Sequence, residues 1–452
     1  MRIVVVGGGQ VGLSLCEQLS KEDHQITVVD TNTADIRRMA DVLDINIVSG
    51  NGAAYATLQE ADAQNADLVI AATSSDEANM ICCMLAKKMG AQRTIARVRN
   101  PEYREQLILM RDELGLSMVI NPEQTAAQAV AHGLYYTSAS SVATFAKGRI
   151  DLLELRVEEN ARLADKQIKD LRCTREANVL IAAVERNGEV FIPNGDFRLC
   201  AGDRIHVAGA SSNLMLFLRI IGRSTRKTEM VMLVGGSKIA GYLCPLLENS
   251  GIKVKLVEHD AAVCEKLSAH LNKTLVINGV ETDQELLLSE DIESMDAVIA
   301  LTDNDEDNLM VSLFAVSHKV PKVITKLDRL SYAEVLSSVG LDNVFSPKIS
   351  IANAIVRYVR SLSNSLGSEI ESLHRIVGGK AEIVEFAMTN RGRHLGIPLS
   401  ELNMKPNVLI SGIVRGGKAI IPRGSDKFEA NDHVLVVTTH KRLDDFDKIF
   451  AE

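Results

Sequence analysis

The stretch Val6-Gly7-Gly8-Gly9-Gln10-Val11-Gly12 decides the fold of the first part of this chain. A short run of β-branched residues precedes it and a helical pattern follows it, which is the context of the first turn of a Rossmann-like unit. Gly7 permits the tight turn, Gly9 lets backbone approach a pyrophosphate, and Gly12 lets helix and sheet pack closely. The helix N-terminus adds partial positive charge that favours phosphate. The stretch therefore predicts a nucleotide site.

Other candidate ligand contacts follow the next expected strands. Asp30 ends the second strand, at the spacing after the last glycine where Rossmann-like units place a ribose-binding acid. A carboxylate there can accept hydrogen bonds from ribose hydroxyls and repels a 2′-phosphate, which favours NAD-type or simple adenosine nucleotides over NADP. Asn51 follows the third strand, and Thr73 and Ser74 follow the fourth. These positions lie at carboxyl ends of parallel strands, where open α/β sheets bind ligands.

Two arginines, Arg97 and Arg99, are expected to end the fifth strand on one sheet face, and Arg97 is the preferred contact for an anion. Asp76 and Glu77 are expected to open the next helix, because acidic side chains favour a first turn. The residues assigned to the first site are Gly7, Gly8, Gly9, Gln10, Val11, Gly12, Asp30, Asn51, Thr73, Ser74 and Arg97.

The chain then repeats itself. The opening stretch returns as Val234-Gly235-Gly236-Ser237-Lys238-Ile239-Ala240. At nearly the same offset, Val69-Ile70-Ala71-Ala72-Thr73 returns as Val298-Ile299-Ala300-Leu301-Thr302, and Asn178 returns as Asn407. A nearly constant offset over half of the chain is not expected by chance, so we infer a tandem duplication.

The second copy of the site is altered. Ser237 replaces the second glycine of the motif, and we expect its side chain to enter the space of the pyrophosphate. Ala240 at the third glycine position is tolerated, and Lys238 could add compensating positive charge. Lys326 stands in place of the first arginine. Whether this copy binds a ligand stays open; the residues assigned to it are Gly235, Ser237, Lys238, Ile239, Glu258 and Thr302.

Each half divides into a larger and a smaller lobe. Short β-branched runs alternate with helical segments in the larger lobe, which predicts βαβ units and a parallel sheet. The smaller lobe is β-rich, with a hairpin turn at Asn187-Gly188 that returns as Gly416-Gly417. The expected fold class is α/β: two tandem Rossmann-like lobes, each followed by a small β-rich α+β lobe. The expected boundaries are 1–121 and 226–346 for the Rossmann-like lobes, 122–144 for a connecting helix, 347–372 for a connecting helix with a linker, and 145–225 and 373–452 for the small lobes.

Pro122 and Pro347 each open one of the connecting helices, as proline does at a first turn. Each helix carries one apolar stripe, which either packs on its parent lobe or crosses to a neighbouring domain. The Ser-rich stretch from Ser361 to Ser372 is interpreted as a linker. The stripes consist of Ala126, Val130 and Leu134 in the first helix and Ile351, Ile355, Val359 and Leu362 in the second.

The composition limits the partners. The 452 residues carry 50 basic and 59 acidic side chains, a net charge of −9, which argues against general binding of nucleic acid or anionic lipid. Aromatic residues make up 4%, so a base-stacking surface is not expected. Seven cysteines without a C-x-x-C pattern fit a reducing cytosol. No apolar run approaches the ~18–20 residues of a membrane span, so we expect a cytoplasmic protein that reaches a membrane only through a protein partner.

Taken together, these motifs resemble the regulator-of-potassium-conductance (RCK) family over nearly the whole chain. The resemblance rests on residues 7–12, 28–30, 72–80, 95–99 and 178–203, and on their repetition. It implies that the Rossmann-like lobes self-associate into a ring on the inner face of the membrane, beneath an integral-membrane potassium channel or transporter subunit. It also implies that the small lobes are regulatory. NAD or NADH, with ATP and ADP as alternatives, would change the shape of the ring and gate ion flow.

Two other hypotheses compete with a regulator. An NAD-dependent oxidoreductase needs an acid or base placed against the nicotinamide. The chain offers no Tyr-x-x-x-Lys pattern, and His132 and His206 are isolated in the sequence. A scaffold would bind nucleotide only for folding. The sequence assigns no catalytic residue and no metal ligand.

Overall fold

The structure is a computed structural model and describes residues 1–32, 37, 40, 43–100, 103, 106–107, 110–159, 161–328, 336, 339–362 and 368–451. The chain divides into two compact units. The first unit contains Met1–Ala126 together with Ser346–Val356, and the second contains Ala127–Phe345 together with Arg357–Glu452. A segment from the second half of the chain therefore belongs to the same unit as the first Rossmann-like lobe.

The first Rossmann-like lobe is a six-stranded parallel sheet in the order β3-β2-β1-β4-β5-β6. Its central strands are buried runs of Val, Ile and Leu, the pattern of a sheet covered on both faces. The strand order reverses between β1 and β4, which places a crevice at the carboxyl ends of these two strands. The strands are β1 (Arg2–Val6), β2 (Gln25–Asp30), β3 (Ile45–Ser49), β4 (Leu68–Ala71), β5 (Thr94–Arg97) and β6 (Met118–Ile120), and the helices include α1 (Gln10–Ser20), α3 (Tyr55–Glu60) and α4 (Asp76–Met89).

The predicted strands and helices of this lobe are confirmed with one correction. Strand β5 ends at Arg97, so Arg99 lies beyond the strand rather than on a shared sheet face. The loop after Arg97 bends because the backbone amides of Arg99 and Asn100 both donate to the Asp76 carboxylate, at 2.8 Å each.

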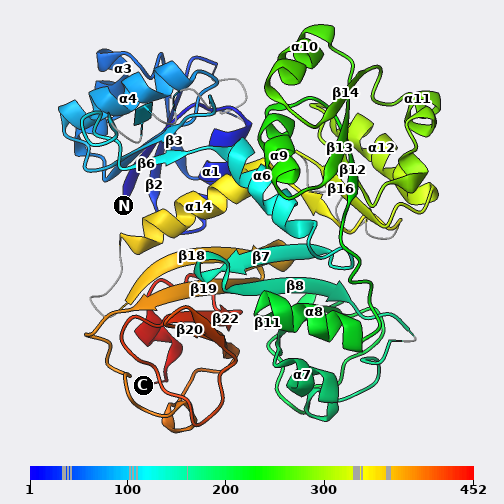
Figure 1. Ribbon diagram of the computed structural model, residues 1–452. Helices are drawn as coiled ribbons and strands as arrows, with labels where there is room; N and C mark the ends of the chain where they lie inside the picture. The colour runs from blue at the N-terminus through cyan, green and yellow to red at the C-terminus, as the bar shows by residue number, and fades with distance from the viewer. Residues whose placement is uncertain are drawn as a thin grey trace. The chain divides into compact units, whose positions relative to one another are not determined.

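The second Rossmann-like lobe repeats this architecture in the order β14-β13-β12-β15-β16-β17. Figure 1 shows α9 and α10 on one side of the sheet and α11 and α12 on the other. The strands are β12 (Met230–Val234), β13 (Lys253–Glu258), β14 (Leu275–Asn278), β15 (Ala297–Ala300), β16 (Lys322–Lys326) and β17 (Val344–Phe345), and the helices are α9 (Lys238–Asn249), α10 (Ala261–His270), α11 (Gln284–Ser289) and α12 (Asp305–Ser317).

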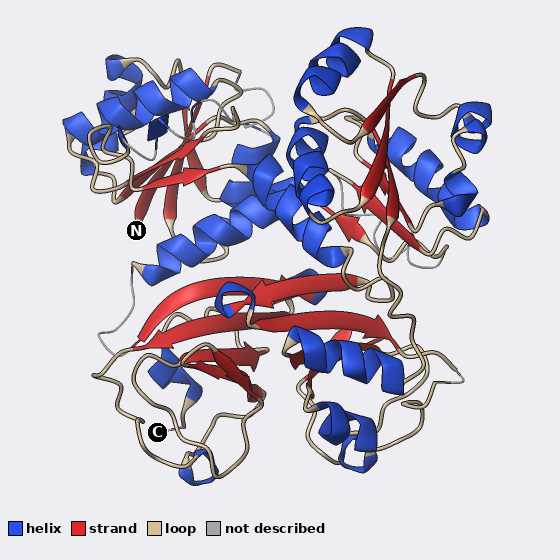
Figure 2. Ribbon diagram, viewed as in Figure 1, coloured by secondary structure: helices blue, strands red, loops and turns tan. Residues whose placement is uncertain are grey.

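Each small lobe is a five-stranded antiparallel sheet (Figure 2). The predicted hairpin turns are confirmed, since all four turn residues have positive φ between 54° and 78°. The first lobe contains β7 (Ser141–Phe145), β8 (Ile150–Arg156), α7 (Arg172–Ala177), β9 (Leu180–Arg186), β10 (Glu189–Phe191), β11 (Arg204–Gly209) and α8 (Ser211–Ile220). The second contains β18 (Ser368–Ile376), β19 (Ala381–Met388), β20 (Val408–Arg415), β21 (Lys418–Ile420) and β22 (His433–Thr438).

Two strands of the small lobes differ from the sequence interpretation. Strand β18 begins at Ser368, within the stretch interpreted as a linker, and pairs with β19 along its length. Strand β7 begins within the segment assigned to the first connecting helix. Both are edge strands of their sheets. Their sequence pattern is too weak to predict a strand, and each is held extended by pairing with its neighbour, β8 or β19.

The two small lobes share one apolar cluster, which includes Phe145 and Ile150 from the first lobe and Ile383 and Val437 from the second. A buried hydrogen bond from the Ala146 amide to Glu385 Oε2, 3.0 Å long, joins the lobes at the same place. The paired small lobes therefore form one body with a common core.

The connecting helices are α6 (Pro122–Gly133) and α14 (Pro347–Ser361). The segment after α6 is bonded to the second Rossmann-like lobe, because Thr228 Oγ1 donates to the Leu134 carbonyl at 2.9 Å and buried Lys322 Nζ donates to the Tyr136 carbonyl at 2.8 Å. The first part of α14 belongs to the first unit. Of the two alternatives, these contacts favour helices that cross to the other half of the chain.

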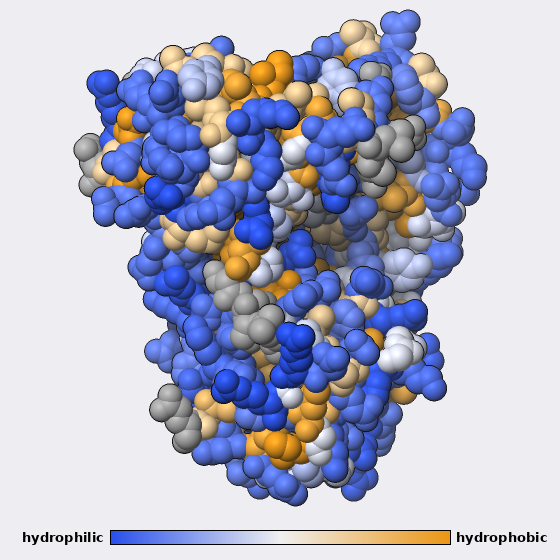
Figure 3. All heavy atoms as spheres, turned by 90° about the vertical axis from the view of Figure 1, so that its left-hand side faces the viewer, coloured by the Kyte–Doolittle hydropathy of each residue, from blue (hydrophilic) through white to orange (hydrophobic). Residues whose placement is uncertain are grey.

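None of the helices described here is both long and apolar enough to cross a membrane. On the face drawn in Figure 3, hydrophilic residues predominate and apolar residues gather in small groups.

Candidate nucleotide sites of the two Rossmann-like lobes

The three glycines of the first motif have three different surroundings. Gly7 has φ +105°, and a Cβ there would lie 2.8 Å from the backbone of Ala72 and Thr73. A Cβ on Gly12 would lie 1.8 Å from the Gly7 carbonyl oxygen. A Cβ on Gly9 would meet nothing within 4 Å, so this residue faces open space. Gly7 and Gly12 are thus required by packing, whereas Gly9 leaves room for a ligand.

Helix α1 begins directly after this loop. Gly9 is its N-cap and supplies no side chain to the amides of the first turn, so these amides are available to an anion. Gln10 is exposed at the start of the helix and Val11 is buried beneath it. The loop therefore presents backbone donors toward the open space at Gly9.

Asp30 lies at the mouth of the loop. Its Oδ2 accepts from the Gly8 amide at 2.5 Å, and its Oδ1 accepts from the Asn32 amide at 2.7 Å. These bonds fix the carboxylate at the end of β2, where a ribose would lie in a Rossmann-like fold. Asn51 lies on the neighbouring loop, where its Oδ1 accepts from the Ala53 amide at 2.9 Å.

Thr73 is held by a residue to which the sequence assigned no role. The buried Asn79 side chain accepts from the Thr73 amide at 2.8 Å and from its hydroxyl at 2.7 Å, and donates to the Arg97 carbonyl at 2.9 Å. Asn308 repeats the arrangement with Thr302 in the second lobe. The identical spacing of these Asn residues in the repeat was the signal available in the sequence. Asn79 ties the ends of β4 and β5 together and shapes this edge of the crevice.

The two arginines have acidic partners. Arg97 pairs with Glu123 in the first turn of α6, with 3.0 Å between Nη2 and Oε1, and both side chains are 14% exposed. Arg99 pairs with Asp76 at 3.3 Å and donates to the Ser74 carbonyl. Arg97, the preferred anion contact, is therefore engaged by the connecting helix.

Helix α14 brings one more cation to the first site. Lys348 Nζ donates to Gln10 Oε1 at 3.2 Å, and both residues belong to the first unit. A lysine from the second half of the chain thus lies beside the first residue of α1. The sequence could not reveal this, because the two residues are 338 positions apart.

The second lobe keeps the backbone of the site but changes its lining. Gly235 has φ +104°, and Glu258 Oε2 accepts from the Gly236 amide at 2.6 Å, as Asp30 does in the first lobe. Ser237 Oγ is covered from solvent and has no hydrogen-bond partner among the described residues. Lys238 is exposed and Ile239 is buried. This copy therefore carries a buried hydroxyl where the first carries open space.

Lys326 also differs from its counterpart. It is buried, and its Nζ donates to the Thr302 carbonyl at 3.0 Å and lies 3.4 Å from Asp303 Oδ1. Its ammonium group is thus engaged at the end of β15, whereas Arg97 in the first lobe pairs with the connecting helix.

Each connecting helix is joined to a buried acid in the small lobe that follows it. Fully buried Asp151, in β8, accepts from Tyr136 Oη at 2.6 Å and contacts His132 Nε2 at 3.0 Å. At the matching place in β19, Glu382 forms two bonds to Arg360 of α14, at 2.7 and 2.9 Å. His132 is therefore not isolated, which corrects the sequence interpretation. Burial opposes ionisation of Asp151, but hydrogen bonds from His132 and Tyr136 outweigh it and lower its pKa.

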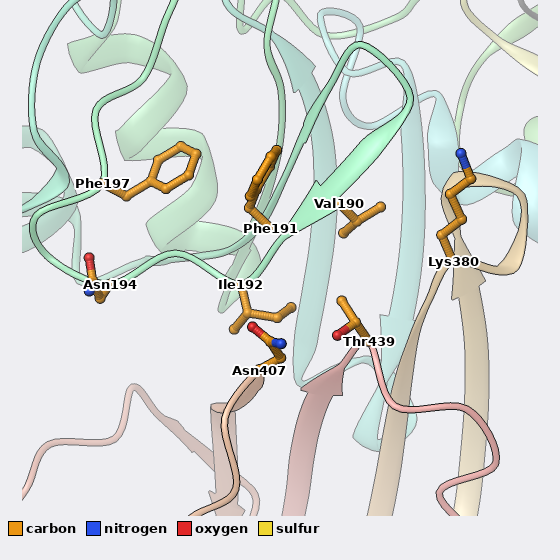
Figure 4. A pocket seen from close by; sticks show the side chains of 8 residues that line it. All are labelled: Val190, Phe191, Ile192, Asn194, Phe197, Lys380, Asn407 and Thr439. Carbon is orange, nitrogen blue, oxygen red and sulfur yellow. The ribbon is translucent and has the colours of Figure 1, made fainter.

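A pocket of about 440 Å³ lies where the small lobes meet (Figure 4). Its walls include Val190, Phe191 and Ile192 from the first lobe and Asn407 and Thr439 from the second. The lysine at its rim, Lys380, already donates to the Gly188 carbonyl at 2.5 Å. Apolar and polar side chains line this pocket in equal number, and its lysine is already engaged by a backbone carbonyl.

Comparison with known proteins agrees with this architecture. The TrkA-N domain model matches residues 3–122 and 231–347, and the TrkA-C domain model matches residues 152–222 and 383–451. The Trk system potassium uptake protein TrkA homolog of Archaeoglobus fulgidus is 32% identical over 450 residues, covering 100% of both chains. The Trk system potassium uptake protein TrkA of Haemophilus influenzae is 30% identical, covering 100% of this chain and 98% of that protein.

Solved structures extend the comparison to the fold. The GsuK channel superposes with a TM-score of 0.64 at 18% identity, covering 97% of this chain and 77% of that one. A GsuK channel bound to NAD superposes with a TM-score of 0.62. These matches show the tandem arrangement of Rossmann-like and small lobes that the structure contains. The chain belongs to the TrkA family and carries both the TrkA-N and the TrkA-C domain twice.

Proposed function

We propose that this chain is a nucleotide-binding regulatory subunit of a membrane potassium-uptake system. The observation that carries the proposal is the first glycine-rich loop, in which Gly9 faces open space beside the uncapped amides of α1 and the Asp30 carboxylate. The relatives are named for potassium uptake. The chain contains two Rossmann-like sheets and two small sheets, which suits a symmetric assembly better than a single catalytic cleft.

The ligand is an adenine nucleotide without a 2′-phosphate. Asp30 can exchange its bond to the Gly8 amide for ribose hydroxyls, whereas a 2′-phosphate would meet its negative charge. NAD and NADH fit this chemistry, and ATP and ADP share the adenosine and phosphate portions. The related fold of GsuK has been solved bound to NAD and bound to ADP.

The route from ligand to gating is helix α14. Lys348, near its start, lies at the N-terminus of α1, and Arg360, near its end, is bonded to buried Glu382 of the second small lobe. A phosphate group that attracts Lys348 therefore acts on an element that has residues in both compact units. By linkage, the nucleotide shifts the assembly by the difference in its affinity for two arrangements of these units.

Self-association into a ring is part of the proposal. Ile81 and Met84 of α4 are 51% and 40% exposed, and Met310 and Leu313, at the matching positions of α12, are 57% and 37% exposed. Apolar side chains exposed at the same positions of both copies indicate a face that other copies of the chain cover. The ring would lie on the inner face of the cell membrane against a TrkH- or TrkG-like channel subunit.

Calorimetric titration tests the ligand assignment. Wild type, Asp30→Ala and the matched second-lobe variant Glu258→Ala would each be titrated with NAD, NADH, ATP and ADP. We expect Asp30→Ala to lose about tenfold or more in affinity, because a bidentate ribose contact is removed. Unchanged affinity in this variant would contradict the first site.

Potassium flux separates the regulator from its competitors. The full chain would be added with each nucleotide to vesicles that contain the membrane subunit. A nucleotide-dependent flux that Asp30→Ala abolishes supports the proposal. Binding without any effect on flux or partner affinity would favour the scaffold, and hydride transfer to any substrate would favour the oxidoreductase.

A further inference from the structure

Three metal-ligating side chains meet at the sheet edge of the second Rossmann-like lobe. Glu258 ends β13, His259 follows it, and Glu281 lies in the loop after β14. His259 Nδ1 lies 2.7 Å from Glu281 Oε1 and 3.1 Å from Glu258 Oε1, and one ligand atom from each residue lies within 4.8 Å of the other two. Both carboxylates are buried, whereas the imidazole is 66% exposed. Two buried carboxylates thus lie against the Nδ1 atom of one exposed histidine.

The first lobe provides an internal comparison. The same edge there carries Asp30 and Thr31, and the position of Glu281 is occupied by Gly52, since both lie at the same place in the loop after the edge strand. A Cβ on Gly52 would lie 2.0 Å from Val6 Cγ1, so no side chain fits there. The Glu-His-Glu set is therefore a property of the second copy and not of the fold.

The other bonds of Glu258 hold it in place without using all of its oxygen lone pairs. Its Oε2 accepts from the Gly236 amide at 2.6 Å and its Oε1 accepts from the Asp260 amide at 2.7 Å. The Asp260 side chain is itself the N-cap of α10, where it accepts from two backbone amides. The carboxylate is thus oriented by backbone donors, as the ligands of metal sites are.

The distances suit a small divalent cation. Ligand atoms at ~2.0–2.1 Å from a tetrahedral metal lie about 3.3 Å apart, so the three atoms would adjust by less than about 1.5 Å. Imidazole nitrogen with two carboxylate oxygens favours Zn²⁺, Mn²⁺ or Co²⁺ over Mg²⁺ and Ca²⁺, which prefer oxygen alone. The His259 side chain is 66% exposed, so solvent reaches this residue of the cluster.

We propose that Glu258, His259 and Glu281 bind a divalent transition-metal ion, so that the second lobe carries a cation site where the first carries a nucleotide site. The ion would join the carboxyl ends of β13 and β14 and neutralise the two buried carboxylates. It would also occupy Glu258, the residue that corresponds to the ribose acceptor Asp30. This lobe would thus respond to a metal ion instead of repeating the response of the first.

Titration of the full chain with Co²⁺, followed by displacement with Zn²⁺, tests this site. We expect one saturable site whose visible absorption comes from nitrogen and oxygen ligands, without the charge-transfer bands of thiolate. Glu281→Gln and His259→Gln should each weaken binding by about tenfold or more. The matched first-lobe variant Asp30→Asn should bind Co²⁺ as wild type does.

His259 is largely exposed, so His259→Gln keeps the test decisive if Glu281→Gln does not fold. An unchanged melting midpoint in calorimetry would report correct folding of both variants. Thiolate bands, an absence of saturable binding, or equal affinity in wild type and both variants would overturn the proposal. None of these outcomes depends on nucleotide regulation, because the metal titration contains no nucleotide.

Discussion

Replacing His206 with leucine should remove part of the acid sensitivity of the paired small lobes. His206 lies in β11, is 2% exposed, and its Nε2 has no hydrogen-bond partner among the described residues. Burial, followed by the positive charge of Arg204, lowers the pKa of His206 from 6.5 to about 4. Burial, followed by the charge of His206, also lowers the pKa of half-buried His374, in β18 of the second small lobe, to about 4.

The direction follows from the two pKa values. Above pH 6.5 the ring of His206 is mostly neutral whether the protein is folded or not, so it does not lower the free energy of unfolding. As the pH falls from 6.5 to 4, the unfolded chain binds a proton that the folded chain does not, and stability is lost. At pH 5 the loss from His206 is about 2 kcal/mol. His374 adds a smaller amount, because it is more exposed.

Differential scanning calorimetry at pH 7.5 and pH 5.0 measures this effect. A loss of about 2 kcal/mol lowers the melting midpoint of the paired small lobes by about 4–8 °C. The melting midpoint of His206→Leu should therefore fall less on acidification than that of wild type. His270→Leu is the matched control, because His270 is exposed and bonded to the Lys266 carbonyl. Its melting midpoint should fall on acidification as much as that of wild type. An equal drop in wild type and His206→Leu would refute the assignment of acid sensitivity to this buried ring.

Contacts elsewhere in the two units lead to three more expected outcomes. Arg360→Leu removes two hydrogen bonds from buried Glu382 but leaves Arg375 paired with it at 3.2 Å, so it should cost about 1–3 kcal/mol in denaturant unfolding. A cost below about 1 kcal/mol would mean that solvent reaches the carboxylate. Gly12→Ala should prevent normal folding because its Cβ would lie 1.8 Å from a carbonyl oxygen, whereas Gly9→Ala should fold with an unchanged melting midpoint yet bind NAD more weakly. Equal melting midpoints of these two glycine variants in calorimetry would contradict the inference that only Gly12 lacks room for a side chain. Met310→Glu should reduce self-association in sedimentation velocity by placing a charge on an exposed apolar face, and an unchanged mass distribution would remove α12 from that face.

Local pattern was enough to predict most of the fold. The strand runs of the Rossmann-like lobes are continuous β-branched stretches, and the glycines at positions 7 and 12 leave no alternative backbone at the turn. The repeat then extended these predictions to the second half. The hairpin turns were equally clear, because Asn-Gly and Gly-Gly tolerate positive φ without strain.

Long-range contacts could not be predicted from the sequence. Strand β18 has a polar, Ser-containing start, and its extended form depends on pairing with β19 rather than on its own propensity. The link from Lys348 to Gln10 depends on where α14 packs, which no local pattern encodes. The role of Asn79 was visible only as an unexplained identity in the repeat, since a buried amide is recognised by its partners. Glu281 was assigned no role because His259, the residue it contacts, lies 22 positions away in the chain.

The membership of α14 in two compact units also bears on how the chain can be divided. A gene cut between the repeats would yield a first half without residues 346–356, which complete its first Rossmann-like unit. Such a half would lose the contacts of that helix, unless its own connecting helix α6 or a second polypeptide replaced them. The duplication is therefore a covalent fusion in which the first Rossmann-like unit is completed by residues of the second half.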